Sequence, residues 1–334
     1  MTATPGKKSG VFLAPFTLFV LATVIPEVLI GSTPLSRLHT LFFQFPLYGS
    51  AAIVARELVI RFRLGRAGLA ALGLAYGITI EGLALQSLFN PHFLNLDISF
   101  GRAAGVNWPW ALYMVGYHAL WSITLPVTIV QLLFPQRAAD SWVGRIGLGI
   151  FTGLLLLMVA AFHGLFVKMS SFNAPLAHHL GAVLVIALLV AAGLRFKRRE
   201  PIAGATPSAV YLPGLLVFLG GLLWLGLYGD IFHHPHLLPP AGNLAAGLAL
   251  AALFAGAAWH LSRAAWSPRH WFSFVTGGLA ASTLFGFVVV TGSLNGSALD
   301  LYGQCGFLLL VGVGLVWLGR RPVIPTNAGM PSAR

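Results

Sequence analysis

Apolar stretches of about 20 residues recur along this chain, separated by short polar loops. A helix needs about 20 residues to cross the ~30 Å hydrocarbon layer of a membrane. Only 8% of the residues are charged and 57% are hydrophobic, which leaves too little charge to cover the surface of a soluble domain. We therefore predict an all-α, polytopic transmembrane helix bundle whose main partner is the lipid bilayer.

Ten stretches have the length of a membrane span. Helix-stopping residues lie between them, as in Gly31-Ser32-Thr33-Pro34 and Asn90-Pro91. The expected transmembrane helices are residues 11–31, 38–60, 67–88, 110–134, 145–167, 177–195, 209–229, 240–262, 270–292 and 301–319. We expect one transmembrane domain over residues 1–321 and a disordered cytoplasmic tail over residues 322–334.

The basic residues predict how the bundle is oriented. With both termini in the cytoplasm, the inner side holds sixteen Lys and Arg residues, whereas the outer side holds only Arg37, Arg102 and Lys168. Cytoplasmic loops are enriched in Lys and Arg, so we predict a multi-pass protein of the cytoplasmic membrane with both termini inside. These loops and anionic lipid headgroups account for the net charge of +12, and no nucleic-acid partner is expected.

Two glutamates and up to four histidines are expected at similar depth in the outer half of the bilayer. They lie on five different helices and are Glu27, Glu81, His118, His163 and the adjacent pair His178 and His179. A charge at membrane depth costs at least ~2.5–3.5 kcal/mol, which makes these residues the candidate site. Glu81 has no basic residue one helical turn away, so it needs a partner from another helix or a neutral form.

His118 is followed at three and four residues by Trp121 and Ser122. This spacing places imidazole, indole and hydroxyl on one helix face, where the latter two could bind a substrate. Structural explanations exist as well. Glu27 follows Pro26 and could bond to backbone groups that the proline leaves free, and a buried histidine can serve packing alone.

Three classes of function fit such a cluster. Glu81 could act as a general base that activates water, with histidines stabilising an oxyanion, as in an intramembrane hydrolase. The same groups could relay protons in a proton-coupled transporter of a small solute. Glutamate and histidine from facing helices could instead bind a metal, or two histidines a haem, although no cofactor is required by the sequence.

A second set of histidines offers a candidate metal site outside the membrane. His233, His234 and His236 lie in an outer loop near Asp230, and His178 and His179 are further candidates. The single cysteine, Cys305, excludes disulfide frameworks and thiolate zinc sites. At the inner interface, Glu57 precedes Arg61 by four residues, which predicts a local ion pair, with Arg56 and Arg61 extending toward water.

One stretch resembles a known family. The segment Tyr76-Gly77-Ile78-Thr79-Ile80-Glu81-Gly82-Leu83, followed by single histidines on the next two helices, resembles the CAAX-protease and bacteriocin-processing superfamily. The resemblance covers about residues 67 to 170 and implies glutamate-type intramembrane proteolysis on a membrane-embedded substrate. It implies Glu81 as the water-activating base, with His118 and His163 as oxyanion-stabilising or orienting residues. Ile80 stands where that family has the first of its two glutamates, and Leu85 stands where it has an arginine.

Overall fold

The computed structural model describes residues 12–93, 101–198, 209–228, 239–262, 266–293 and 296–321. Within these residues the chain forms ten helical rods that follow the ten expected spans. The first five are α1 (Leu13–Thr23) with η1 (Val24–Leu29), η2 (Leu35–Thr40) with α2 (Leu41–Arg61), α3 (Arg66–Ile78) with η3 (Thr79–Ala84), α4 (Trp108–Tyr117) with η5 (His118–Thr124) and α5 (Leu125–Leu133), and α6 (Arg145–Ser170). The other five are α7 (Leu176–Arg195), α8 (Leu212–Leu222) with η7 (Leu223–Tyr228), α9 (Pro240–Ser262), α10 (Pro268–Val288) with η8 (Val289–Ser293), and α11 (Ala298–Arg320).

The predicted all-α membrane bundle is confirmed. Seven of the helices are long and apolar enough to cross a membrane, and three shorter apolar helices cover residues 13–29, 212–226 and 244–253. Besides the helices, the described residues contain a short 3-10 turn, η6 (Pro135–Arg137), and one hairpin of β1 (Arg102–Ala103) and β2 (Val106–Asn107). The predicted tail, residues 322–334, lies outside the described residues.

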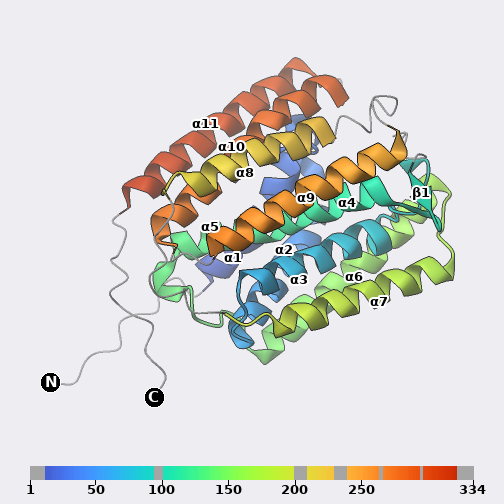
Figure 1. Cartoon of the computed structure of the whole chain (residues 1–334), viewed down its shortest axis with the longest axis horizontal. Helices are drawn as coiled ribbons and strands as arrows, with labels where there is room; N and C mark the ends of the chain where they lie inside the picture. The colour runs from blue at the N-terminus through green and yellow to red at the C-terminus, as the bar shows by residue number, and fades with distance from the viewer. Residues whose placement is uncertain are drawn as a thin grey trace.

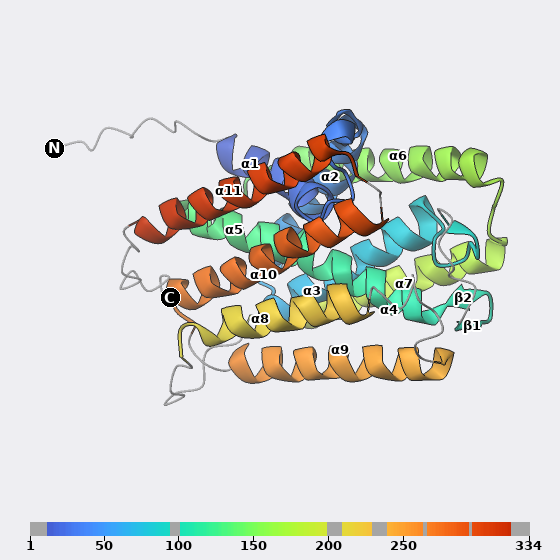
Figure 2. The ribbon, with the colours of Figure 1, turned by 90° about the horizontal axis from the view of Figure 1, so that it is seen from above.

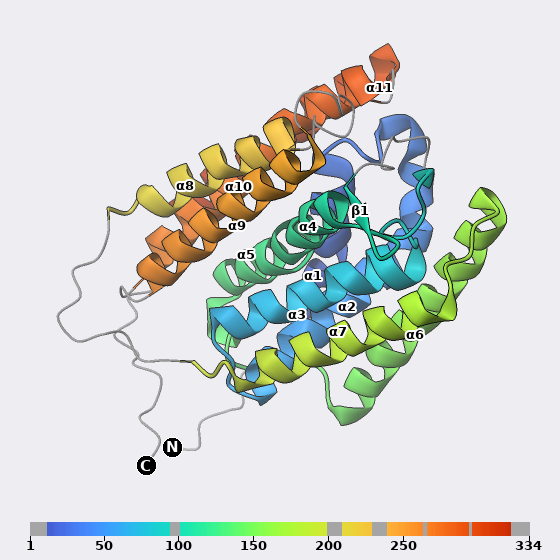
Figure 3. The ribbon, with the colours of Figure 1, turned by 45° about the vertical axis from the view of Figure 1, so that its right-hand side comes forward.

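The rods are arranged in three groups (Figures 1 and 3). The rod of α4, η5 and α5 lies centrally with α1, while α8 to α11 cover one side and α3, α6 and α7 the other. Figure 2 shows α9 and α6 at opposite sides of the bundle. The most extensive packing joins α8 to α10, α3 to α7, α1 to α2, and α2 to α6. Side chains of α6 and α7 are largely exposed and apolar, as expected of helices that face lipid.

Local sequence explains where several helices begin. Asn107 caps the rod that contains α4 by accepting a hydrogen bond from the Trp110 backbone, and Pro109 suits the first turn. Ser267 and Ser297 form capping boxes at the starts of α10 and α11.

Several rods change from α-helix to π-helix along their length. Among the described residues, π-helical turns occupy η1, η3, η5, η7 and η8. Single π turns inside helices occur frequently at functional sites because they redirect side chains and backbone groups. Glu27, Glu81 and His118 lie on η1, η3 and η5, one on each.

Candidate functional site

Glu81 and His118 meet in the core of the bundle. Glu81 Oε1 lies 2.9 Å from His118 Nε2, and the two side chains are 1% and 2% exposed. Two glycines of α3 permit the approach, since a Cβ atom at Gly73 or Gly77 would lie 2.8 Å from a Cα atom of the neighbouring rod. The partner that Glu81 was predicted to need on another helix is therefore His118.

Hydroxyl groups extend this pair at both ends. Ser87 donates to Glu81 Oε2 and accepts from the Trp110 indole N–H at 3.0 Å. On the other side, His118 Nδ1 lies 2.9 Å from Ser122 Oγ. A neutral His118 that donates from Nε2 to the carboxylate accepts from Ser122 at Nδ1. The result is a buried chain of hydrogen-bonding groups that runs from Trp110 to Ser122.

Glu27 forms a second polar centre beside this chain. Its carboxylate accepts from the Tyr48 hydroxyl at 2.6 Å and from the Thr33 hydroxyl at 2.9 Å. Gln44 donates in turn to Thr33 at 3.3 Å. Glu27 is half-buried, whereas Glu81 and His118 are fully buried. The expectation that Glu27 supports the Glu81 cluster stays a prediction, since the hydrogen bonds of Glu27 among the described residues go to Tyr48 and Thr33.

Aromatic rings connect the two centres. The rings of Tyr48 and Tyr76 lie 5.9 and 5.8 Å from the His118 ring, and 5.9 Å from each other. Glu27 interacts electrostatically with both His118 and Glu81. The Tyr76 hydroxyl is buried and has no hydrogen-bond partner among the described residues. Tyr76 therefore presents an unsatisfied polar group within this cluster.

His163 does not join the Glu81 carboxylate. Its Nδ1 donates to the Leu83 carbonyl at 2.9 Å, and its ring lies 5.3 Å from that of His179. In the described part of the chain no hydrogen bond links His163 to Glu81. The structure thus separates the expected group into a Glu81–His118 pair and a peripheral set of histidines.

The two expected substrate-binding residues point to different neighbours. Ser122 contacts His118, as the shared helix face predicted. Trp121 instead donates from its indole N–H to the Gly278 carbonyl of α10 at 3.1 Å and stacks on Tyr117. The π-helical geometry of η5 accounts for this difference, because it alters the angular spacing on which a shared α-helical face depends.

The candidate metal ligands that lie in the described residues do not form a common site. His178 Nε2 donates to the Ala104 carbonyl of the hairpin at 3.0 Å, while His179 contacts His163. No group of three His, Cys, Asp or Glu side chains that could hold a metal occurs among the described residues. His233, His234 and His236 lie outside the described residues.

A family described as an uncharacterized membrane protein family matches residues 16–316. The chain belongs to this family. The match covers nearly all of the ten rods and agrees with the predicted integral membrane protein. The description carries no statement about proteolysis, so the CAAX-protease resemblance stays a prediction. No curated protein and no solved structure matches the chain.

Several polar residues of the cluster in this family member were not predicted. Ser87, Tyr48 and Tyr76 contact the glutamates or His118, and Trp110 joins them by donating to Ser87. Tyr48 and Tyr76 each precede a glycine, a pattern without a fixed period along the chain. Their positions along the predicted spans could have indicated them, since both tyrosines lie within spans near the level of Glu27 and Glu81.

The expected pair at the inner interface is confirmed in part. Arg61 lies 3.3 Å from Glu57, but the expectation that Arg56 reaches water is wrong. Arg56 is fully buried, 2.8 Å from Glu57 and 3.5 Å above the Trp142 ring. The carbonyls of Arg137 and Ala138 accept from its guanidinium, which explains how a buried arginine is accommodated.

Proposed function

We propose that this integral membrane protein is a proton-coupled carrier of a small solute, in which Glu81 and His118 bind and release the proton. The observation that carries the proposal is the 2.9 Å contact between Glu81 Oε1 and His118 Nε2 in the core of the bundle. A carboxyl and an imidazole in contact can share one proton and remain neutral as a pair, whichever group holds it. Burying such a neutral pair costs less free energy than burying either charge alone.

Charge balance supports coupling between proton and solute. Glu27 is a second carboxyl at similar depth, and in the described residues it accepts from hydroxyls but forms no ion pair. An ionised carboxylate without a cation is costly in a membrane, so Glu27 needs a proton or the positive charge of a solute. Proton and solute would then compete for one site, which is the basis of exchange across a membrane.

Glu27 also offers a route for the proton. It is the most accessible carboxyl of the cluster, and its Tyr48 partner contacts the His118 ring. Tyrosine hydroxyls both donate and accept hydrogen bonds. We propose that protons enter at Glu27 and reach His118 past Tyr48 and Tyr76.

Intramembrane hydrolysis is the second candidate, because the same contact favours it. A general base next to an imidazole is the arrangement that water activation needs. Two observations rank it lower. Both Glu81 oxygens already accept hydrogen bonds, from His118 and Ser87, and His163 binds a backbone carbonyl.

The test uses everted membrane vesicles that contain the full chain, energised to hold a pH gradient reported by a fluorescent dye. A panel of small cationic, neutral and anionic solutes is added in turn. We expect one class of solute to dissipate the gradient with the wild-type protein and not with Glu81→Gln. Asp140→Asn is the matched control, because it neutralises a carboxylate that is 60% exposed, and it should behave as wild type.

Two outcomes would contradict the proposal. One is a wild-type protein that leaves the gradient unchanged with every solute and shows no pH-dependent carboxyl absorption in the infrared. The other is a Glu81→Gln variant, present at wild-type levels, that transports as well as the wild type. Cleavage of a membrane-embedded peptide by wild type but not by Glu81→Gln would favour the hydrolase instead.

A further inference from the structure

The α2–α3 connection and the end of α7 form one surface, although about 130 residues separate them in the chain. The Gly65 backbone N–H donates to the Phe196 carbonyl at 2.8 Å, and the Arg198 backbone N–H donates to the Arg63 carbonyl at 2.9 Å. Leu64 and Lys197 form an antiparallel bridge between these bonds. We call this surface the basic ledge, and it comprises residues 62–65 and 195–198.

The two segments of the basic ledge pack closely against each other. A Cβ atom at Gly65 would lie 3.1 Å from the Lys197 carbonyl oxygen, which shows how closely the two backbones approach. Leu64 is buried beneath the ledge at 5% exposure. The Lys197 ammonium donates to the Phe62 carbonyl at 3.1 Å and lies 5.7 Å from the Phe62 ring.

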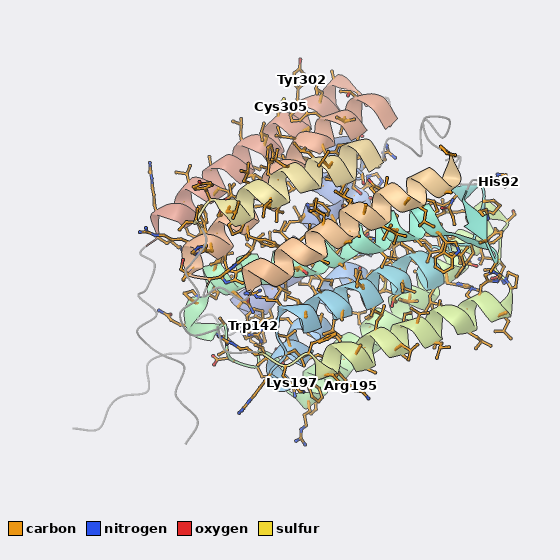
Figure 4. The ribbon with its side chains drawn as sticks, in the orientation of Figure 1. His92, Trp142, Arg195, Lys197, Tyr302 and Cys305 are labelled. Carbon is orange, nitrogen blue, oxygen red and sulfur yellow. The ribbon has the colours of Figure 1, made fainter. Side chains whose placement is uncertain are left out.

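Positive charge on the ledge is exposed. The side chains of Arg63, Arg195 and Lys197 all face outward, and none of them forms an ion pair within the described residues. Arg61 and Arg66, which flank the ledge, are instead occupied by Glu57 and by Thr128 with Trp271. Figure 4 shows Arg195 and Lys197 at the end of the bundle opposite to His92.

Two aromatic side chains accompany these charges. Phe62 and Phe196 are 45% and 47% exposed, and they lie where two spanning helices end. Exposed aromatic rings at this level match the boundary between acyl chains and headgroups. The ledge therefore combines cations with an apolar margin, as a lipid with an anionic headgroup requires.

We propose that the basic ledge binds the phosphate headgroup of an anionic phospholipid in the inner leaflet. The three exposed cations contact the headgroup, and the two phenylalanines contact its glycerol and upper acyl chains. This binding site is independent of the proton site and goes beyond the general attraction of basic loops to membranes, because two distant segments are hydrogen-bonded into one platform. A zwitterionic lipid would bind less well, since its amine repels the cations.

The experiment measures lipid retained by the full chain in detergent, by native mass spectrometry, after addition of phosphatidylglycerol or phosphatidylcholine. The ledge variant is Arg63→Gln/Arg195→Gln/Lys197→Gln. The matched control is Arg145→Gln/Arg269→Gln/Arg320→Gln, which removes three exposed arginines elsewhere. We expect each ledge cation to contribute roughly fivefold in affinity, so the ledge variant should bind phosphatidylglycerol on the order of a hundredfold more weakly. The control should bind as wild type does.

Equal retention of the two lipids by the wild type would overturn the proposal. Equal weakening in the ledge variant and the control would do the same, since it would indicate only net charge. Displacement of phosphatidylglycerol by millimolar inorganic phosphate would indicate a phosphate-ion site rather than a lipid site. If the ledge variant fails to fold, the single changes Arg195→Gln and Arg195→Lys decide the question, because only the first should weaken retention.

Discussion

Among the described residues, two acid–base pairs are buried at similar contact distances. Arg56 lies 2.8 Å from Glu57 near the end of α2, on the side predicted to be cytoplasmic (the inner pair), and His118 lies 2.9 Å from Glu81 in the half predicted to be outer (the outer pair). All four side chains are at most 2% exposed. The two pairs differ in the base, and in our proposal this difference separates a structural role from a functional one.

The inner pair is held in one charge state. Arginine keeps its proton at every physiological pH, and Glu57 accepts from Arg61, Ser141 and the Trp142 backbone as well. These bonds join the end of α2 to the loop before α6. The Glu57 carboxylate thus ties the two segments together, although Arg56 Nε has no hydrogen-bond partner among the described residues, and the arginine offers no proton to exchange.

The outer pair has different chemistry. Unlike guanidinium, imidazole exists in proteins in neutral and charged forms, and the hydroxyls of its neighbours Ser122 and Ser87 can both donate and accept hydrogen bonds. The pair also lies beside the half-buried Glu27 and the unpartnered Tyr76 hydroxyl. The comparison teaches that burial and distance alone do not identify a site, because the chemistry of the partners decides what a pair can do.

The largest effect is expected from breaking the inner pair. Arg56→Leu leaves Arg61 as the one cation paired with the buried Glu57 among the described residues, and loss of one member of a buried pair costs about 3–5 kcal/mol. We expect a large fall in the melting temperature and in the yield of folded protein in detergent. Asp140→Asn is the control, since it neutralises a carboxylate that is 60% exposed and 4.0 Å from Arg137, and such pairs contribute about 0–1 kcal/mol. Equal melting temperatures for the two variants would disprove the structural role.

Breaking the outer pair should affect activity more than stability. His118→Gln keeps a neutral hydrogen-bonding side chain beside Glu81 but cannot take up the proton, so we expect solute-driven proton movement to fall at least about 100-fold. The melting temperature should fall much less than in Arg56→Leu. An unchanged transport rate would remove His118 from the mechanism.

A smaller effect is expected at the tyrosine that faces both glutamates. Tyr76→Phe keeps the ring contacts with Tyr48 and His118 but removes the hydroxyl that has no partner among the described residues. We expect a several-fold slower proton movement with no loss of stability, because no hydrogen bond is broken. Tyr113→Phe is a matched change on the neighbouring rod, and it should leave the rate unaltered. A Tyr76→Phe variant as fast as wild type would place the proton route elsewhere.

The smallest effect on transport is expected from replacing His163, and this change distinguishes the carrier from the hydrolase. His163→Gln removes the hydrogen bond to the Leu83 carbonyl and should cost about 1 kcal/mol of stability. In the proton-carrier proposal the transport rate stays near that of wild type. In the hydrolase suggested by the CAAX-protease resemblance, His163 is essential and its replacement abolishes activity. The ratio of the His163→Gln and His118→Gln rates therefore tests the two functions directly.

The sequence predicted much of the fold because the membrane imposes a simple length rule. Ten apolar stretches predicted ten rods within a few residues of their observed bounds. The site was predicted in part. Counting residues along each helix placed Glu81 and His118 at the same depth, and the two side chains are in contact. Depth does not determine the direction in which a side chain points around the helix axis. It therefore could not predict that His163 bonds to the Leu83 carbonyl and not to the carboxylate.

Helical periodicity also failed to predict the direction in which one side chain points around its helix axis. Spacing placed Trp121 and Ser122 on the His118 face, yet η5 is π-helical and directs Trp121 toward α10. Likewise, the number of residues to the interface suggested that Arg56 reaches water, whereas the loop carrying Trp142 folds over it. Local spacing contains no information about which loop covers a helix end.

Composition and hydropathy alone determined the membrane environment and the helical class. They also determined which ionisable residues needed an explanation. Each of these depends on the free-energy cost of placing polar groups in lipid. Which of these residues form pairs depends on the packed helices. Contact between Glu81 and His118 requires the glycine-lined approach of α3 to the central rod and the π turns on both, and these are properties of two surfaces in contact rather than of either segment.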